Sequence, residues 1–289
     1  REGITIGAVE GVQGISWTEV TLGGVSNHAG TTPMSMRTDA AYVAAVMDAE
    51  RAGRIPTEAQ RRYNIGVNGN PVFPEIFSRP ATACGGSIRA AELLHEGGIV
   101  YSPAGGTHHG RPDRASGFCY FNDPVLGILA MLDGGLRRVA YVDLDAHHGD
   151  GVEAAFADRS EVLTISVHES GRWPHSGDGP GCNRQTARNV PVPPGFNDDE
   201  MAAVMDGAIL PVVASFRPQA LVVQCGADAL ADDPLSRLAL SNGALWRAVR
   251  DLVPLAPRLL VLGGGGYNPW SVARCWTCLL YTSPSPRDR

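Results

Sequence analysis

Residues 138–150 read Arg-Val-Ala-Tyr-Val-Asp-Leu-Asp-Ala-His-His-Gly-Asp. The first half is apolar and β-branched, as expected for a strand buried on both faces of a parallel sheet. The second half is rich in Asp and His, so the predicted strand ends in ionisable side chains. Ligands bind beyond the carboxyl ends of the strands in open parallel α/β sheets. The stretch therefore predicts both a strand and a site at its end.

Further apolar runs of the same kind predict the rest of the sheet. They lie at Gly98–Ser102, Val162–Val167, Ala220–Gln224 and Arg258–Leu262. Helical stretches alternate with them, at Gly86–Glu96, Asp123–Leu132, Asp198–Ser215 and Asn242–Leu255. This alternation predicts an α/β fold, with a mostly parallel sheet and helices on both faces.

The bulk properties limit the classes of function. A chain of 289 residues with 44% hydrophobic content suits one large α/β domain or two small ones. The net charge is -6 and no Lys/Arg block stands out, so no nucleic-acid or membrane partner is expected. The first residues do not read as a signal peptide. The six cysteines are scattered, which favours a reducing, cytoplasmic location.

Each predicted strand is followed by polar or glycine-rich residues. These segments are Gly105–His109, Asp143–Asp150, His168–Arg172, Cys225–Asp228 and Gly263–Tyr267. Because the carboxyl ends of parallel strands meet at one edge of a sheet, the segments are expected to converge on one site.

The Asp and His residues after the second strand indicate a metal site. Asp143, Asp145 and His147 occupy positions i, i+2 and i+4, which point to one face of a strand. Asp145 and His147 supply one oxygen and one nitrogen ligand, and Asp228 is the best candidate for the third. Two carboxylates and one imidazole leave a position open, as in a catalytic zinc site, although iron(II) or cobalt would also suit these donors.

The adjacent histidines His108 and His109 indicate acid–base chemistry. Each needs a carboxylate to fix its tautomer, and Asp143 and Asp150 can serve. His109 can accept a proton from a water molecule and return it to a leaving amine. A helix-capping or packing role is the alternative for this pair.

A glycine run precedes Tyr267. It lacks the Lys-Ser/Thr pair of a nucleotide-binding loop, so we interpret Gly263–Gly266 as flexible backbone that places the tyrosine in the site. The phenol can donate a hydrogen bond to an oxyanion beside a metal. The alternative is a tyrosine that only packs.

Together these segments resemble the histone deacetylase superfamily, in particular the bacterial acetoin-utilisation deacetylases. The matching motifs are Gly105–His109, Ser116–Asp123, Asp143–Glu153, Gln224–Asp228 and Gly263–Asn268. The resemblance implies a three-layer, arginase/deacetylase-like α/β fold. It also implies a zinc-dependent hydrolase that removes acetyl groups from acetylated amines, with acetyl-lysine of a protein or a small acetylated amine as the expected substrate.

The resemblance also implies roles for individual residues. The zinc ligands would be Asp145, His147 and Asp228. The catalytic group would be His109 as general base and acid with its partner Asp150, His108 with its partner Asp143, and Tyr267, which polarises the acetyl carbonyl. A narrow substrate tunnel would be formed by Gly106, Phe118 and Trp173. A structural potassium ion would be bound by Asp143, Asp145, His147, Ser166 and Val167.

One departure from the family concerns substrate recognition. Near Gly69, many relatives carry an acidic residue that grips the substrate backbone, whereas Gly69-Asn70-Pro71 offers none. This difference bears on peptide recognition rather than on the chemistry.

Both ends of the chain differ from the rest. Ser26–Met34 and Arg37–Ala40 resemble the dimerisation lobe of carbamoylase and allantoate-amidohydrolase metallopeptidases, and Cys278–Asp288 resembles a translated sequencing-library adapter. We therefore expect a foreign fragment at 1–41, an incomplete deacetylase domain at 42–277 and an artefactual tail at 278–289, so that the fold is truncated at both ends. The Cys275/Cys278 pair then carries no redox or zinc function.

Two rival functions stay open at this point. The Asp-Ala-His stretch and Asp232-Asp-Pro234 also suggest a related arginase-like dinuclear manganese hydrolase. The chain would alternatively be an inactive, truncated module that still binds acetyl-lysine. The oligomeric state is not indicated by the sequence.

Overall fold

The computed structural model describes residues 40–179 and 186–282. Within these residues six strands form one sheet in the order β1-β6-β5-β2-β3-β4. The strands are β1 (Gly98–Ser102), β2 (Val139–Asp143), β3 (Val162–Glu169), β4 (Ala187–Val192), β5 (Ala220–Gln224) and β6 (Arg258–Leu262). Every neighbouring pair is parallel, which confirms the predicted type of sheet.

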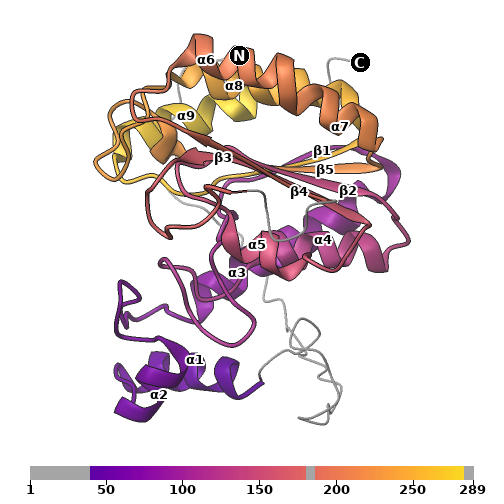
Figure 1. Ribbon diagram of the computed structural model, residues 1–289. Coiled ribbons are helices and arrows are strands. Elements are labelled where there is room, and N and C mark those ends of the chain that lie inside the picture. The colour runs from indigo at the N-terminus through magenta and orange to yellow at the C-terminus, as the bar shows by residue number, and fades with distance from the viewer. Residues whose placement is uncertain (1–39, 180–185, 283–289) are drawn as a thin grey trace, which may run out of the picture.

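Helices cover both faces of the sheet (Figure 1). One layer holds α6 (Asp198–Val204), α7 (Leu210–Phe216), α8 (Asn242–Leu252) and α9 (Pro269–Thr282). The opposite layer holds α3 (Ser78–Leu93), α4 (Asp123–Asp133) and α5 (Asp150–Ala155). The remaining pair, α1 (Ala40–Ala52) and α2 (Thr57–Tyr63), lies farther from the sheet, beyond α3. The result is the expected three-layer arrangement.

Side chains of β2 show how the sheet joins the two helical layers. Ala140 and Val142 are buried in the core on the α6–α9 side, whereas Val139 and Tyr141 are buried in the core on the α3–α5 side. Successive side chains of a strand point to opposite faces, so a strand between two layers must be apolar throughout. This explains why the apolar runs predicted the strands well.

The α1–α2 pair forms a small core of its own. Tyr42 and Ile65 are buried there with Tyr120, and the Tyr42 hydroxyl donates to the Tyr120 carbonyl. The carboxylate of Glu50 accepts hydrogen bonds from the backbone amides of Phe77 (2.8 Å) and Ser78 (2.9 Å), at the start of α3. Because the first amides of a helix have no partner within it, Glu50 acts as a cap supplied by another helix.

Several elements differ from the sequence prediction. The helix predicted over Asp198–Ser215 contains a π-helical segment, Met205–Ile209, between α6 and α7. Pro211 has no amide hydrogen to donate to the carbonyl of Gly207, so the regular pattern is interrupted there. Strand β4 was not predicted; its sequence contains the polar residues Arg188 and Asn189 and also Pro191, which sheets accept at an edge.

Most of the foreign fragment predicted at 1–41 and of the tail predicted at 278–289 lies outside the described residues. The helix α1 begins within the first of these regions, at Ala40, and α9 ends within the second, at Thr282. Both domain boundaries remain predictions. Across 40–179 and 186–282, no helix combines the length and the hydrophobicity needed to cross a bilayer.

Candidate metal centre and active site

The polar loops converge as the sequence predicted. Strand β2 lies between β5 and β3, with Asp143 in register with Gln224 on one side and Ser166 on the other. The loops that follow β2 and β5 therefore start next to each other. They bring Asp145 and Asp228 together, although these residues are far apart in sequence.

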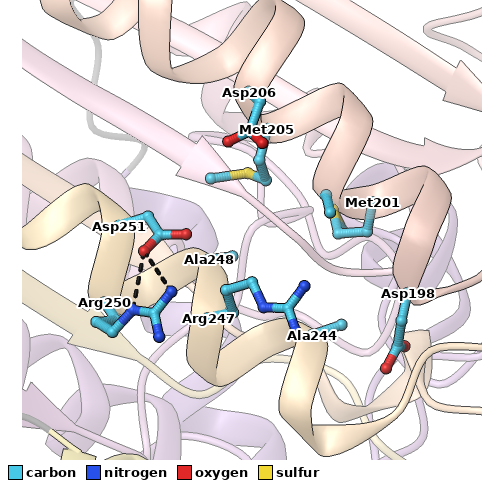
Figure 2. Close-up of a pocket in the computed structure, with 10 residues that line it drawn as sticks. Asp198, Met201, Met205, Asp206, Ala244, Arg247, Ala248, Arg250 and Asp251 are labelled. Atoms are coloured by element: carbon cyan, nitrogen blue, oxygen red, sulfur yellow. Dashed lines mark hydrogen bonds and ion pairs between the residues drawn. The ribbon is translucent and has the colours of Figure 1, made fainter.

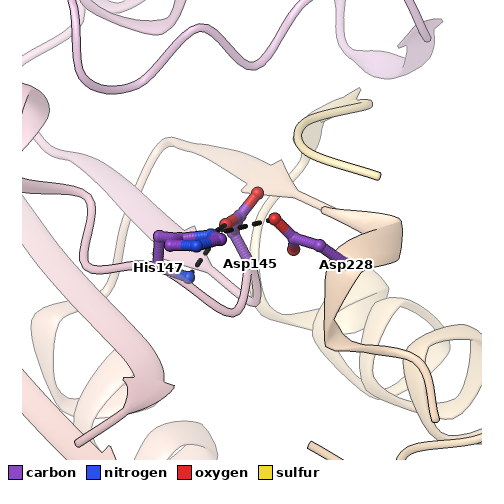
Figure 3. Close-up of side chains that lie close together, drawn as sticks. All are labelled: Asp145, His147 and Asp228. Atoms are coloured by element: carbon purple, nitrogen blue, oxygen red, sulfur yellow. Dashed lines mark hydrogen bonds and ion pairs between the residues drawn. The ribbon is translucent and has the colours of Figure 1, made fainter. Parts of the chain in front are cut away.

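Asp145, His147 and Asp228 form a compact buried group (Figure 3). Their ligand atoms all lie within 4.8 Å of one another. His147 Nδ1 is 3.2 Å from Asp145 Oδ1 and 3.0 Å from Asp228 Oδ2. Two atoms that bind one tetrahedral zinc ion at its usual bond lengths are about 3.3 Å apart, so the spacing fits a shared ion.

The charges of this group also fit a cation. Burial and the neighbouring Asp145 carboxylate raise the pKa of Asp228 to about 7. Burial opposes a charge on His147 as well, but the two carboxylates raise its pKa to about 10. Protons on Asp228 and His147 are thus favoured, because they offset the negative charge that is buried at this point. A divalent cation would supply the missing positive charge.

Backbone hydrogen bonds hold the two carboxylates in place. Asp145 Oδ2 accepts the amide of Gly265 at 2.8 Å, and Asp228 Oδ1 accepts the amide of Ala146 at 3.0 Å. A Cβ atom at Gly265 would lie 2.1 Å from Asp228 Oδ2, so no other residue type fits at that point. The glycine run is therefore required by the close approach of the backbone to both carboxylates.

Each of the adjacent histidines is paired with the predicted carboxylate. His108 Nδ1 donates to Asp143 Oδ2 at 2.7 Å, and His109 Nδ1 donates to Asp150 Oδ1 at 2.7 Å. All four side chains are buried. A hydrogen bond at Nδ1 leaves Nε2 of His109 free to exchange a proton with a ligand.

The environments of the two histidines separate their protonation states. Burial, together with the charge of His108, lowers the pKa of His109 to about 4. For His108, burial is outweighed by the carboxylates of Asp143 and Asp145, which raise its pKa to about 9. Near neutral pH, His109 is thus the unprotonated member of the pair and is able to act as a base.

Three contributions were not predicted from the sequence. Arg111 donates from its guanidinium to Asp150 Oδ2, opposite the oxygen that His109 uses. Gln224 Nε2 lies 2.9 Å from His108 Nδ1, and its Oε1 accepts the hydroxyl of Tyr141 at 2.8 Å. Asp123, at the start of α4, accepts the amides of the 106–107 loop at 2.9 and 2.8 Å. That these polar residues support the site by hydrogen bonds can be recognised only once the fold is known.

A cavity of about 630 Å³ leads to the site. His109 and His147 line its base, and Phe118, Trp173 and Tyr267 line its sides. The Trp173 ring lies 4.6 Å from that of His109, centroid to centroid, and the Phe118 ring lies 6.1 Å from that of Tyr267. Phe118 and Trp173, the predicted aromatic walls, thus line the same cavity as His109, the predicted general base.

Phe118 has an unusual backbone conformation, with φ at 64°. Bulky residues rarely adopt positive φ, so the conformation must be held by its surroundings. The buried Asn70 does this, because its Oδ1 accepts the amide of Phe118 at 2.9 Å. Asn70 follows Gly69, so the segment without an acidic residue instead positions an aromatic wall.

Gly106 was predicted to line the substrate tunnel, and Ser166 and Val167 were predicted to bind potassium together with Asp143, Asp145 and His147. A Cβ on Gly106 would lie 2.6 Å from the Cα of Gly264, so the two loops pack closely at this point. The Ser166 hydroxyl lies 3.3 Å from the amide of Gly149, which donates to it. Val167 is buried in β3. Both roles stay predictions.

The Asp232-Asp-Pro234 stretch has a structural role. Asp233 Oδ1 accepts the amide of Leu235 at 2.8 Å, and Asp233 Oδ2 accepts the amide of Tyr267 at 2.7 Å. Asp233 therefore fixes the backbone of Tyr267. In the described residues it is not part of the metal group, which weakens the argument for an arginase-like site.

A second hollow of about 200 Å³ lies between α6 and α8 (Figure 2). Met201 and Met205 line it together with Arg247, Arg250 and Asp251. It shares no lining residue with the cavity above the metal group.

The fold and the site define an α/β protein with a candidate metal centre and paired acid–base histidines at the carboxyl edge of a parallel sheet. A family profile described as "Histone deacetylase domain" matches residues 22–282. The chain therefore belongs to the histone deacetylase family, which confirms the resemblance seen in the sequence.

Individual relatives agree with this assignment. The chain is 41% identical over 225 residues to Histone deacetylase 8 of Xenopus laevis, covering 75% of this chain and 69% of that protein. It is 40% identical over 243 residues to Histone deacetylase 3 of rice, covering 82% of this chain and 47% of that protein. The chain thus spans about half the length of several curated relatives.

Solved structures agree as well. A crystal structure of an HDAC homolog from Aquifex aeolicus matches with a TM-score of 0.79 at 37% identity, covering 84% of this chain and 68% of that one. A structure of an HDAC homolog complexed with SAHA matches with a TM-score of 0.78, with the same identity and coverage. The deacetylase-like fold expected from the sequence is therefore confirmed.

Proposed function

We propose that this chain hydrolyses the amide bond of an acetylated amine, either acetyl-lysine in a protein or a small acetylated amine. The observation that carries the proposal is a single juxtaposition. The Asp145–His147–Asp228 group lies beside the His109–Asp150 pair, at the base of a cavity with aromatic sides. Family membership supports the same reaction.

Zinc is the metal we propose, with iron(II) as the alternative. An ion held by Asp145, His147 and Asp228 would supply Lewis acidity toward an amide carbonyl and a water molecule. The two oxygen donors and one nitrogen donor leave room for such ligands. We also propose that Asp143, Asp145, His147, Ser166 and Val167 hold a potassium ion that supports this loop.

His109 is the proposed general base and acid. Its Nδ1–H is bound to Asp150, so its Nε2 is the nitrogen that accepts a proton from the attacking water. The same proton then passes to the leaving nitrogen as the carbon–nitrogen bond breaks. Acetate and the free amine are the products. Asp150 and Arg111 hold the imidazole in its orientation throughout.

Tyr267 is the proposed oxyanion donor. Burial and the charges of Asp145 and Asp228 raise the pKa of its phenol, so the hydroxyl keeps its proton. A protonated phenol can donate a hydrogen bond to the developing negative charge. Phe118 and Trp173 would pack along the alkyl chain that carries the acetylated nitrogen, and would keep water away from it.

The test combines metal content with turnover. The purified chain should contain about one zinc ion and should release fluorophore from an acetyl-lysine substrate in a chelator-sensitive reaction. Bound zinc without turnover would instead favour an inactive module that still binds acetyl-lysine. In that case binding of an acetyl-lysine peptide would be measured by fluorescence anisotropy.

A further inference from the structure

The mouth of the active-site cavity carries an unbalanced positive charge. Its charged lining residues, apart from the histidines, are Glu169, Arg172 and Arg237. Glu169 and Arg172 form a mutual ion pair, so they cancel each other. Arg237 is left as a charged lining residue outside this ion pair.

The Glu169–Arg172 pair has little capacity left for a ligand. Arg172 donates from Nε (2.6 Å) and Nη2 (2.9 Å) to the two oxygens of Glu169, and from Nη1 to the carbonyl of Leu235 (2.6 Å). Only 4% of the Glu169 side chain is exposed. This carboxylate is therefore unable to attract a cationic substrate.

Arg237 has a fixed backbone and an available side chain. Its amide donates to Glu169 Oε2 at 2.8 Å, and its carbonyl accepts the amide of Gly195 at 2.7 Å. Its side chain is exposed, and its guanidinium makes no hydrogen bond or salt bridge within residues 40–179 and 186–282. A guanidinium on an anchored backbone is a suitable group for binding a carboxylate.

Two further lining residues carry no charge. Asn68 and Gly69 also line the cavity, and neither supplies a carboxylate. The described lining residues therefore include no carboxylate that is free to pair with Arg237.

We propose that Arg237 binds a carboxylate of the substrate close to the acetylated amine. This inference rests on the proposed function and specifies its substrate class. The carboxylate has two chemical sources: an acidic residue beside acetyl-lysine in a protein, or the α-carboxylate of a small acetylated amino acid. An acetylated polyamine, which is cationic, would be disfavoured by the same charge.

The experiment compares matched substrates. Acetyl-lysine peptides with Asp, Asn or Lys beside the acetylated residue represent the first source. Nε-acetyl-lysine and its α-carboxamide represent the second. We would measure kcat/KM for each on the zinc-loaded chain at low and high salt, with the wild type, Arg237→Ala, Arg237→Glu and Arg237→Lys. Arg247→Ala is the control, because Arg247 is an exposed arginine on α8 that lines the other hollow (Figure 2).

The expected result is a preference of about threefold to fivefold for the Asp peptide over the Asn peptide, the size of one exposed ion pair. Arg237→Ala should abolish it, Arg237→Glu should reverse it toward the Lys peptide, and Arg237→Lys should retain part of it. High salt should weaken it in the wild type, because exposed charges are screened. Arg247→Ala should behave like the wild type.

A parallel preference for Nε-acetyl-lysine over its carboxamide would indicate the small-molecule source. Equal kcat/KM for the charged and neutral members of both substrate sets would overturn the inference, while turnover of the Asn peptide would leave the proposed function intact. No turnover of any substrate by the zinc-loaded wild type would instead refute the proposed function. The affinities of the His109→Ala variant for the Asp and Asn peptides would then test the role of Arg237 separately. Equal affinities for the two peptides would contradict that role.

Discussion

His109 and Asp150 are joined by a 2.7 Å hydrogen bond between Nδ1 and Oδ1, across 41 positions of the sequence. The bond fixes the ring so that Nε2 faces the cavity side of the site. His109→Ala should lower kcat by about 10²–10⁴-fold, the usual contribution of a general base. Asp150→Asn should cause a smaller loss, because the base remains but is less well oriented. Zinc content should be unchanged in both, as measured by elemental analysis, and near-wild-type turnover of His109→Ala would contradict the assignment.

Tyr267→Phe removes one hydroxyl and leaves the aromatic wall in place. We expect kcat to fall by about 10²–10³-fold, as for the loss of one oxyanion donor. Steady-state kinetics would separate this effect from binding, since KM should change little. A loss confined to KM would indicate that the phenol only shapes the cavity.

Asp228→Asn leaves the size of the side chain nearly unchanged but removes a charge from the metal group. The variant should bind zinc far more weakly than the wild type, as measured by competition with a chromophoric chelator. Asp233→Asn is a matched control, because Asp233 is also buried but binds backbone amides instead of the metal group. Equal zinc affinity in wild type and Asp228→Asn would remove Asp228 from the ligand set.

Tyr141→Phe tests the buried network behind the catalytic histidines. The hydroxyl lies 2.7 Å from Asp143 Oδ2 and 2.8 Å from Gln224 Oε1, both buried, and donates its single proton to one of these acceptors at a time. Its removal leaves a buried acceptor short of a donor, so the free energy of unfolding should fall by about 1–3 kcal/mol. Urea unfolding at fixed zinc concentration would measure this, and an unchanged midpoint would show that the network adds nothing to stability.

Glu50 should make stability depend on pH. Partial burial opposes its charge, but hydrogen bonds from Ser78 and Phe77 outweigh this and lower the pKa of the carboxyl. A lowered pKa means that the contribution to stability is complete above the unfolded-state value of about 4.3 and is lost as pH falls through the folded-state value.

Glu50→Gln should therefore be less stable than the wild type at pH 7, by about 0.5–1 kcal/mol as for a lost helix cap, and the gap should close in acid. Glu58→Gln, an exposed position on α2, is the control. Thermal unfolding between pH 3 and 7 would show the effect. A gap that stays constant over this range would mean that the charge of Glu50 is not involved.

The sequence predicted the structure best at the apolar strands and at the Asp and His residues that follow them. Apolar strands between two helical layers have no polar face, so β1, β2, β5 and β6 were located from composition alone. The grouping of Asp145, His147 and Asp228 followed from the rule that parallel strands end at one edge. Strand β4 was not predicted because it lies at the edge of the sheet, where polar residues and Pro191 are tolerated.

Supporting residues could not be predicted in the same way. Arg111 and Asn70 are ordinary polar residues in the sequence, and their importance depends on what lies opposite them in space. Arg111 binds the far oxygen of Asp150, and Asn70 holds the backbone of Phe118. Local sequence spacing has no signal for contacts of this kind.

The pairing of β1 with β6 has a consequence for how the protein is made. Gly98 is in register with Arg258, and Ser102 with Leu262, so the first strand of the described sheet has the last one as its neighbour. Such distant pairing gives a high contact order and favours slow folding. On the ribosome, β1 must wait for most of the chain before it can be covered, and a chaperone that shields it in the meantime would raise the yield of active protein.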